Sequence, residues 1–358
     1  MNKQLTTLRT LDALVEAGLV PTEQREGVAA VARRYAIAIP PAITSLIETA
    51  GPADPIARQF VPSAAELHAT ADELSDPIGD DTRSPLNGIV HRYPDRVLLK
   101  LANVCPVYCR FCFRRETVGL GGEASLSADE LAAALAYIEG DPRIFEVIVT
   151  GGDPLIISPR RIAEVTEALD AIAHVRVIRW HSRVPVVAPE RVTRELAAAL
   201  TVTDKAVFVA LHTNHVRELT TQACAAIGRL ADAGVSMLSQ SVLLKGVNDN
   251  VESLEALLRG LLAARVKPYY LHHGDLAPGT SHFRTTLEDG RRLMAELRGR
   301  LSGAALPAYV LDIPGGHGKV PVDPDHVGPP DPMTGERRVI DPWGQAHVYR
   351  DRKDDRDA

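Results

Sequence analysis

Six short β-rich runs alternate with helical patterns between residues 97 and 271 of this chain. Such alternation is typical of parallel strands joined by crossover helices, which places the chain in the α/β class. Six units fall short of the eight that close a (β/α) barrel, so we expect an incomplete (β/α)6 barrel, with an open doubly wound sheet as the alternative. The expected strands are 97–101, 145–150, 176–180, 206–211, 237–244 and 268–271, and the expected helices are 128–139, 159–172, 189–199, 222–233 and 251–264.

The two ends of the chain differ in pattern from this middle part. Apolar residues such as Leu11, Leu14 and Val15 recur at helical spacing, which predicts helices before a polar, proline-containing loop at 77–87. The C-terminal end is rich in Gly and Pro and closes with a run of charged residues at 350–357, which we expect to be a solvated tail. The predicted divisions are an N-terminal helical region at 1–85, the partial barrel at 86–300 and a C-terminal segment at 301–358.

Composition excludes several classes of protein. The 358 residues are 45% hydrophobic with a formal net charge of −6, which argues against a disordered chain and against a general nucleic-acid surface. No run of roughly 18 uncharged apolar residues occurs, so no membrane span is expected. Asp12 and Glu16 interrupt the apolar stretch that a secretory signal would need, which predicts a cytoplasmic protein with reduced thiols.

Three of the four cysteines, Cys105, Cys109 and Cys112, fall on the loop after the first predicted strand. Loops at the carboxyl ends of parallel strands are where active-site residues gather. A structural zinc would need four ligands, yet Cys224 lies far away in a helical pattern, where we expect a buried apolar residue. Three thiolates are one fewer than normally enclose a cubane cluster, so one iron would stay open to a small-molecule ligand.

The C-x3-C-x2-C spacing, with Phe111 before the last cysteine, resembles the signature of radical S-adenosylmethionine (SAM) enzymes. The resemblance implies a [4Fe–4S] cluster on the three cysteines, whose open iron chelates the amino and carboxylate groups of SAM. Gly151, Gly152 and Asp153 resemble the superfamily's glycine-rich turn against the methionine amino group. The alternative is an ordinary strand-to-helix turn, because Gly-Gly is common there.

A second glycine-rich segment, 311–319 (LDIPGGHGK), ends in Lys319. It does not fit a phosphate-binding loop, since Ile313 stands where that motif needs Gly and Val320 where it needs Ser or Thr. Two interpretations remain open on these residues. The segment is a turn with Lys319 in solvent, or Lys319 forms a Schiff base with pyridoxal phosphate, because a partly desolvated amine is nucleophilic.

Taken together, the motifs resemble the lysine 2,3-aminomutase family in their order along the chain. The resemblance implies a radical SAM partial barrel and makes Lys319 the lysine that holds pyridoxal phosphate. It places Arg92, Tyr93 and Arg96 against that cofactor. The matching strings are 91–96 (HRYPDR), 105–115 (CPVYCRFCFRR), 183–187 (RVPVV), 240–249 (QSVLLKGVND), 268–271 (PYYL), 274–275 (GD) and 282–285 (HFRT).

The same resemblance implies how a substrate is held. Arg114 matches the arginine that pairs with the substrate carboxylate, although Arg110 or Arg115 could fill a structural or cluster-supporting role nearby. Asp275 and Asp312 match two acids that hold the distal ammonium of lysine; for each, the alternative is a helix cap or a turn residue. A long cationic substrate needs an anionic end and a cationic end in one cavity. The family's glutamate-acting relatives lack this pair of acids, so the pair favours lysine.

The implied activity is that of an isomerase. An electron donor reduces the cluster, SAM is split to a 5′-deoxyadenosyl radical, and the nitrogen migrates from Cα to Cβ to convert L-lysine to β-lysine. The cofactors supply the difficult chemistry, and the protein supplies position, charge and shelter from water. We also expect a homo-oligomer.

Two departures from the family's pattern bear on which branch of the family this chain resembles. The free-lysine enzymes complete a zinc site with cysteines, but Asn250 stands at one such position and no cysteine follows Cys224, so we predict no structural zinc. This absence and Phe113 resemble the branch that makes β-lysine for elongation factor P, whereas the loop around Asp312 resembles the free-lysine branch. A non-catalytic iron–sulphur redox sensor and a zinc-stabilised binding module are the alternatives from other classes.

Overall fold

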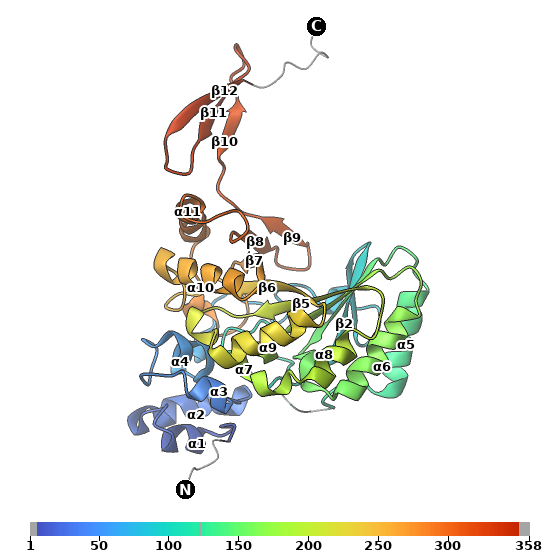
Figure 1. Ribbon diagram of the computed structural model, residues 1–358. Helices are drawn as coiled ribbons and strands as arrows, with labels where there is room; N and C mark the ends of the chain where they lie inside the picture. Colours follow the sequence, from blue (N-terminus) through green and yellow to red (C-terminus); the bar gives the residue numbers. More distant parts are fainter. Residues whose placement is uncertain (1–5, 120, 122, 351–358) are drawn as a thin grey trace.

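The computed structural model describes residues 6–119, 121 and 123–350. At its centre is a curled, nine-stranded sheet in the order β1 to β9 (Figure 1). Strands β2 to β8 run parallel, so the predicted α/β class and incomplete barrel are confirmed. The strands are β1 Ile89–Tyr93, β2 Arg96–Ala102, β3 Glu146–Gly151, β4 Val177–Ser182, β5 Ala206–His212, β6 Ser236–Val242, β7 Lys267–His272, β8 Ala308–Asp312 and β9 Lys319–Pro321.

The sheet extends beyond the six predicted strands at both edges. At one edge β1 pairs antiparallel with β2 through a tight turn that sets Tyr93 opposite Arg96. At the other edge a seventh parallel strand, β8, pairs with β7, and the antiparallel strand β9 sets Lys319 opposite Asp312. The sheet therefore continues to Pro321, and the divisions proposed at residues 85 and 300 stay a prediction.

Crossover helices cover the outside of the curl (Figure 1). In α9 the buried residues Ala223, Ala226, Ile227 and Leu230 recur every three or four positions, which aligns them on the face against the sheet. Cys224 lies beside this face and is only half-buried, so the expectation of a buried cysteine is wrong. The longer helices are α5 Ala128–Glu139, α6 Pro159–Asp170, α8 Arg194–Leu200, α9 Thr221–Asp232, α10 Val251–Ala263 and α11 Leu287–Arg298, with the short α7 at Val184–Val187.

The N-terminal region forms several short helices rather than a few long ones. Prolines start or precede most of them, because proline is tolerated in a first turn and breaks a helix interior. The region packs beside α7 and α9 (Figure 1), and its Gln59 and Glu66 are fully buried against the rest of the molecule. Its helices are α1 Leu11–Glu16, α2 Arg25–Arg34, α3 Pro41–Thr44 and α4 Pro55–Phe60, with 3-10 turns at Thr22–Gln24, Ala64–Leu67 and Asp81–Arg83.

The C-terminal segment ends in a separate antiparallel sheet that projects from the body (Figure 1). Its strands are β10 Val327–Pro330, β11 Glu336–Ile340 and β12 Ala346–Arg350. The tail predicted at 350–357 lies outside the described residues after Arg350. Within the described part of the chain, no helix is long and apolar enough to cross a membrane.

Candidate active site

A cavity of about 550 Å³ opens inside the curl, at the carboxyl ends of the parallel strands. Its walls come from segments more than 200 residues apart in the chain, which only the curled sheet brings together. Every site residue predicted from the sequence lines it. These residues are Arg92, Tyr93, Arg96, Cys105, Cys109, Cys112, Arg114, Gly151, Gly152, Asp153, Asp275, Asp312 and Lys319.

The cysteine loop follows β2 and forms one wall of the cavity. Burial raises the pKa of all three thiols, to about 11 for Cys109, and neighbouring acidic groups and thiols add to the effect. The Nη1 of Arg183 donates to the Sγ of Cys109 at 3.5 Å. Among the described residues no three His, Cys, Asp or Glu side chains converge on one metal ion. The triplet still fits a cubane, in which each thiolate binds a different iron.

Two glycines let the end of β3 pass against the cysteine loop. A Cβ on Gly151 would lie 2.3 Å from the carbonyl oxygen of Ala102, and one on Gly152 would lie 2.3 Å from that of Val104. The backbone N–H of Asp153 donates to the same Val104 oxygen at 2.9 Å. These positions therefore need glycine for a physical reason, the close approach of two backbones.

The Asp153 carboxylate is fully engaged within the fold. It accepts hydrogen bonds from the hydroxyl of Ser182 at 2.8 Å and from the backbone N–H groups of Arg183 at 2.7 Å, Leu155 at 3.1 Å and Val184 at 3.2 Å. These bonds join the end of β3 to the end of β4. Asp153 thus positions the turn at the cavity wall.

Two buried ion networks lie behind the cysteine loop, and sequence reasoning missed most of their members. Arg183 pairs with Glu218 at 2.5 Å and donates to Gln59 at 2.9 Å. Glu66 accepts from Arg110 at 2.6 Å and also pairs with Arg115. Both networks tie the N-terminal region to the loop that carries the cysteines. The strings 105–115 and 183–187, which contain the arginines of both networks, were the sequence signals for them.

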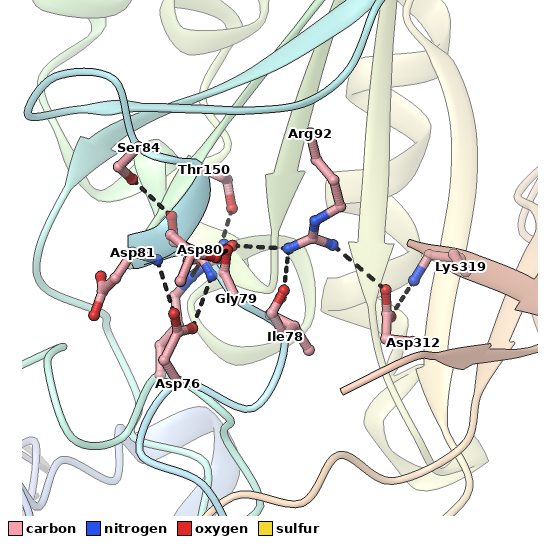
Figure 2. A network of polar contacts seen from close by, with 12 residues as sticks. Asp76, Ile78, Gly79, Asp80, Asp81, Ser84, Arg92, Thr150, Asp312 and Lys319 are labelled. Atoms are coloured by element: carbon pink, nitrogen blue, oxygen red, sulfur yellow. Dashed lines mark hydrogen bonds and ion pairs between the residues drawn. The ribbon is translucent and has the colours of Figure 1, made fainter. Parts of the chain in front are cut away.

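Charges of alternating sign run from Asp80 to Lys319 (Figure 2). Arg114 donates to Asp80 through Nε at 2.9 Å and Nη2 at 2.8 Å. Arg92 lies 3.4 Å from the other oxygen of Asp80 and 3.8 Å from Asp312, which in turn pairs with Lys319. Although burial alone would raise the pKa of Asp80, Arg114, Lys100 and Arg92 lower it. Sequence reasoning missed Asp80, which lies on the polar loop expected at 77–87.

Lys319 begins β9, where its backbone and side chain are both held. Its N–H donates to the hydroxyl of Tyr93 at 2.8 Å. The loop before it contacts the 77–87 loop, since Gly315 donates to the Pro77 carbonyl at 3.1 Å. The Nζ atom pairs with Asp312 and lies 3.3 Å from the Nδ1 of His272. Lys319 is therefore not a solvated turn residue.

Asp275 is the acid in the cavity that has no partner. Among the described residues, none gives its carboxylate a hydrogen bond or an ion pair. Burial, reinforced by the negative charge of Asp312, raises its pKa to about 7. An acid held in this way favours a cationic ligand, which would restore its charged form.

Aromatic and imidazole groups complete the cavity, and no motif in the sequence singled them out. Tyr269 and Tyr270 stack with ring centroids 3.8 Å apart. His181 and His212 lie with centroids 5.9 Å apart, and burial lowers the pKa of His212 to about 3. Arg96, at the rim, lies over the Tyr93 ring at 3.8 Å and pairs with Asp95 at 2.7 Å. The His181 and His212 rings are thus uncharged near neutral pH.

Comparison with known proteins agrees with this geometry. The radical SAM superfamily model matches residues 99–258, and a lysine-2,3-aminomutase model matches residues 294–330. The L-lysine 2,3-aminomutase of Clostridium subterminale is 40% identical over 320 residues, which are 89% of this chain and 76% of that protein. The chain belongs to the lysine 2,3-aminomutase family. The two matched regions contain the cysteine triplet and Lys319, respectively.

Other members of the family differ in their named substrate. The L-lysine 2,3-aminomutase of Escherichia coli is 33% identical over 289 residues, which cover 81% of this chain and 84% of that protein. The glutamate 2,3-aminomutase of Clostridioides difficile is 33% identical over 327 residues, or 91% of this chain and 76% of that protein. The family establishes a radical SAM aminomutase, an isomerase of small molecules that uses SAM and a [4Fe–4S] cluster.

Proposed function

We propose that this aminomutase converts L-lysine to β-lysine and uses pyridoxal phosphate held by Lys319. The observation that carries the proposal is the unpaired carboxylate of Asp275, in the same cavity as the cysteine triplet and Lys319. A substrate whose side chain ends in an ammonium would supply the missing charge. A substrate with a second carboxylate would add repulsion there, which disfavours glutamate.

Asp312 is proposed to be the second acid for the distal ammonium. In the described structure it pairs with the ammonium of Lys319. This contact supports the assignment, because the carboxylate already binds a primary ammonium of the kind that ends the proposed substrate's side chain.

Arg114 is proposed to bind the substrate carboxylate. Its Nε and Nη2 atoms are engaged by Asp80, while Nη1 has only long contacts, 3.4 Å to the Thr150 hydroxyl and 3.5 Å to the Gly151 carbonyl. Nη1 therefore keeps donor capacity for a ligand. Asp80 would act as the positioning residue that fixes the guanidinium plane.

The residues around Lys319 fit pyridoxal phosphate. The Nε of Arg92 and the Nε2 of His272 are buried and have no hydrogen-bond partner among the described residues. Buried donors left open in this way suit a polar, anionic ligand. When bound, the cofactor supplies an aldehyde that carries the migrating nitrogen. We assign Arg92, Tyr93 and Arg96 to its contacts, with Tyr93 also holding the Lys319 backbone.

Cys105, Cys109 and Cys112 are proposed to hold the [4Fe–4S] cluster, with Gly151, Gly152 and Asp153 forming the turn that faces SAM. The cluster and SAM together supply the radical that removes hydrogen from the substrate. The chain contributes a wall with no room for side chains at the two glycines, and three half-buried thiols that line the cavity. An external electron donor completes the system.

The test is a product assay on the full chain, reconstituted anaerobically with iron, sulphide and pyridoxal phosphate. L-Lysine, L-ornithine and L-glutamate are supplied separately with SAM and a reductant, and β-amino products are measured by mass spectrometry. We expect β-lysine as the principal product and no β-glutamate. β-Glutamate as the principal product, or a β-amino product at an unchanged rate from Lys319→Ala, would contradict the proposal.

A further inference from the structure

His272, the last residue of β7, contacts the side-chain nitrogen of Lys319 and the acid that pairs with it. Its Nδ1 lies 3.3 Å from the Nζ of Lys319 and 3.5 Å from the Oδ2 of Asp312. Its other ring nitrogen, Nε2, is buried without a hydrogen-bond partner among the described residues. Nδ1 therefore lies between the Lys319 ammonium, which can donate a proton to it, and the Asp312 carboxylate, which can stabilise the protonated ring.

We propose that His272 is the proton acceptor that frees the Lys319 amine, an inference that rests on the proposed function of Lys319. With Nδ1 unprotonated, the ring accepts a hydrogen bond from the lysine ammonium. After the proton moves, Nδ1–H faces the Asp312 carboxylate. The same ring atom thus serves both states, with donor and acceptor exchanged.

The step balances in protons and electrons. The Nζ–H bond of Lys319 breaks and an Nδ1–H bond of His272 forms, so an ammonium and a neutral imidazole become an amine and an imidazolium. The freed lone pair of Nζ can attack an aldehyde carbon. When a C=N bond has replaced C=O, one molecule of water has left, and the proton on His272 is available to assist that departure.

The other groups near Nζ are poor proton acceptors. Although burial alone would raise the pKa of Asp312, the neighbouring His272 and the charge of Lys319 lower it well below the usual range. Burial and the hydrogen bond from Tyr269 raise the pKa of Tyr270, whose ring centroid lies 5.5 Å from Nζ, so that phenol stays protonated. His272 is the group in reach whose neutral form is available near pH 7.

The surroundings of His272 explain how its basicity changes during the step. Burial and the positive charge of Lys319 lower the pKa of His272, while Asp312 opposes them. Transfer of the proton removes the charge on Lys319 and leaves Asp312, so the imidazolium is stabilised once it forms. The charged or titratable groups that face His272 are Lys319 on β9, Asp312 on β8, Tyr270 on β7, His212 on β5 and His181 on β4.

The experiment measures covalent capture of pyridoxal phosphate rather than turnover. The full chain, purified without the cofactor, is mixed with pyridoxal phosphate, quenched with borohydride at timed intervals, and the pyridoxyl mass on the Lys319 peptide is quantified from pH 6 to 10. For His272→Gln we expect capture near pH 7 to fall about 100-fold, because an amide cannot take the proton. Capture should recover in alkaline solution, where hydroxide removes the proton from the Lys319 ammonium.

A matched control and a rescue separate proton transfer from structure. His273→Gln changes the neighbouring histidine, whose Nδ1 instead contacts the Tyr309 hydroxyl at 2.7 Å, and should leave capture and its pH profile unchanged. For His272→Ala, added imidazole should restore capture in proportion to its concentration, which a purely structural role would not allow. His272→Asn serves as a second variant if His272→Gln does not fold.

The outcomes distinguish this inference from the function on which it rests. If wild-type protein is never labelled at Lys319, the proposed cofactor role of that lysine fails. If wild type is labelled and the folded His272 variants are labelled at the same rate with the same pH profile, only the role of His272 is overturned. The role of His272 is also overturned if His272→Ala is labelled more slowly and added imidazole does not restore the labelling.

Discussion

Among the single residues of the cavity, most charged side chains form an ion pair within the described part of the chain. Arg114, Arg92 and Lys319 are each matched to a carboxylate, whereas Asp275 is not. A carboxyl group in this position costs stability when it is ionised, because it has left water without gaining a counter-ion. The ionised form of the residue that the proposed function needs most is therefore destabilised by its surroundings.

Asp275 predicts a pH dependence of stability. Its pKa is about 7 in the folded chain against 3.8 for the ordinary side chain, so folding takes up a proton between these values. The contribution of Asp275 to the free energy of unfolding is present in full below about pH 4. It falls by about 2 to 4 kcal/mol as the pH rises to 7. Asp275→Asn should raise the thermal unfolding midpoint at pH 8 and leave it nearly unchanged at pH 4.

The control for this measurement is Asp129→Asn, an exposed aspartate in the first turn of α5. It should alter the midpoint equally little at both pH values. A similar shift for Asp275→Asn at pH 4 and pH 8 would show that the carboxyl group is not held in its protonated form.

At the scale of elements, the site depends on how closely backbones approach each other. The turn after β3 leaves no room for a Cβ against the cysteine loop, and Gly79 likewise would place a Cβ 2.6 Å from the backbone of Gly316 in the loop before Lys319. Where two loops meet at glycines, their backbones pack directly against each other and hold the loops rigidly. A site that binds a cluster or forms a covalent bond requires such rigidity.

Gly152→Ala is expected to displace the cysteine loop. The new methyl group would meet the Val104 carbonyl oxygen at 2.3 Å, a backbone atom that can only move with its loop. We expect a destabilisation of about 1–3 kcal/mol and a loss of most of the iron retained after anaerobic reconstitution. Iron and sulphide content and visible absorption provide the measurement.

Gly303→Ala is the matched control, because nothing lies within 4 Å of its Cβ position. It should keep the iron content of wild type and gain or lose little stability. Full iron retention in folded Gly152→Ala would mean that the cysteine loop tolerates the displacement.

At the scale of the whole molecule, buried ion pairs join the N-terminal helices to the barrel. Glu66 is 1% exposed and is shared by Arg110 and Arg115, both from the cysteine loop. Burial alone would raise the pKa of Glu66, but the two arginines lower it. This contribution to stability is present at neutral pH and is lost as the solution becomes acidic.

Glu66→Ala should destabilise the protein by about 3–5 kcal/mol at pH 7, because two buried arginines lose their counter-ion. Urea unfolding measures the change, and reduced iron retention should accompany it. Glu296→Ala removes an acid from an exposed pair with Arg292 and should change neither quantity measurably. Equal effects of the two substitutions would argue against a structural role for the buried network.

The sequence alone was enough to predict the alternation of strands and helices and the placement of the cysteines after the first parallel strand. Each of these signals is local, since periodicity, capping and motif spacing are properties of neighbouring residues. The capping box at Ser127 and the bounds of α5 were predictable for this reason.

Which side chains meet depends on the three-dimensional fold. Asp80, His272 and Glu218 lie in separate segments without a distinctive motif, and their partners are set by the curl of the sheet and by the packing of the N-terminal helices. The short edge strands β1 and β9 were likewise unpredictable, because a strand of three to five residues is stabilised by its neighbour rather than by its own pattern. The pairing of β8 with β9 is what brings Lys319 opposite Asp312 and within reach of His272.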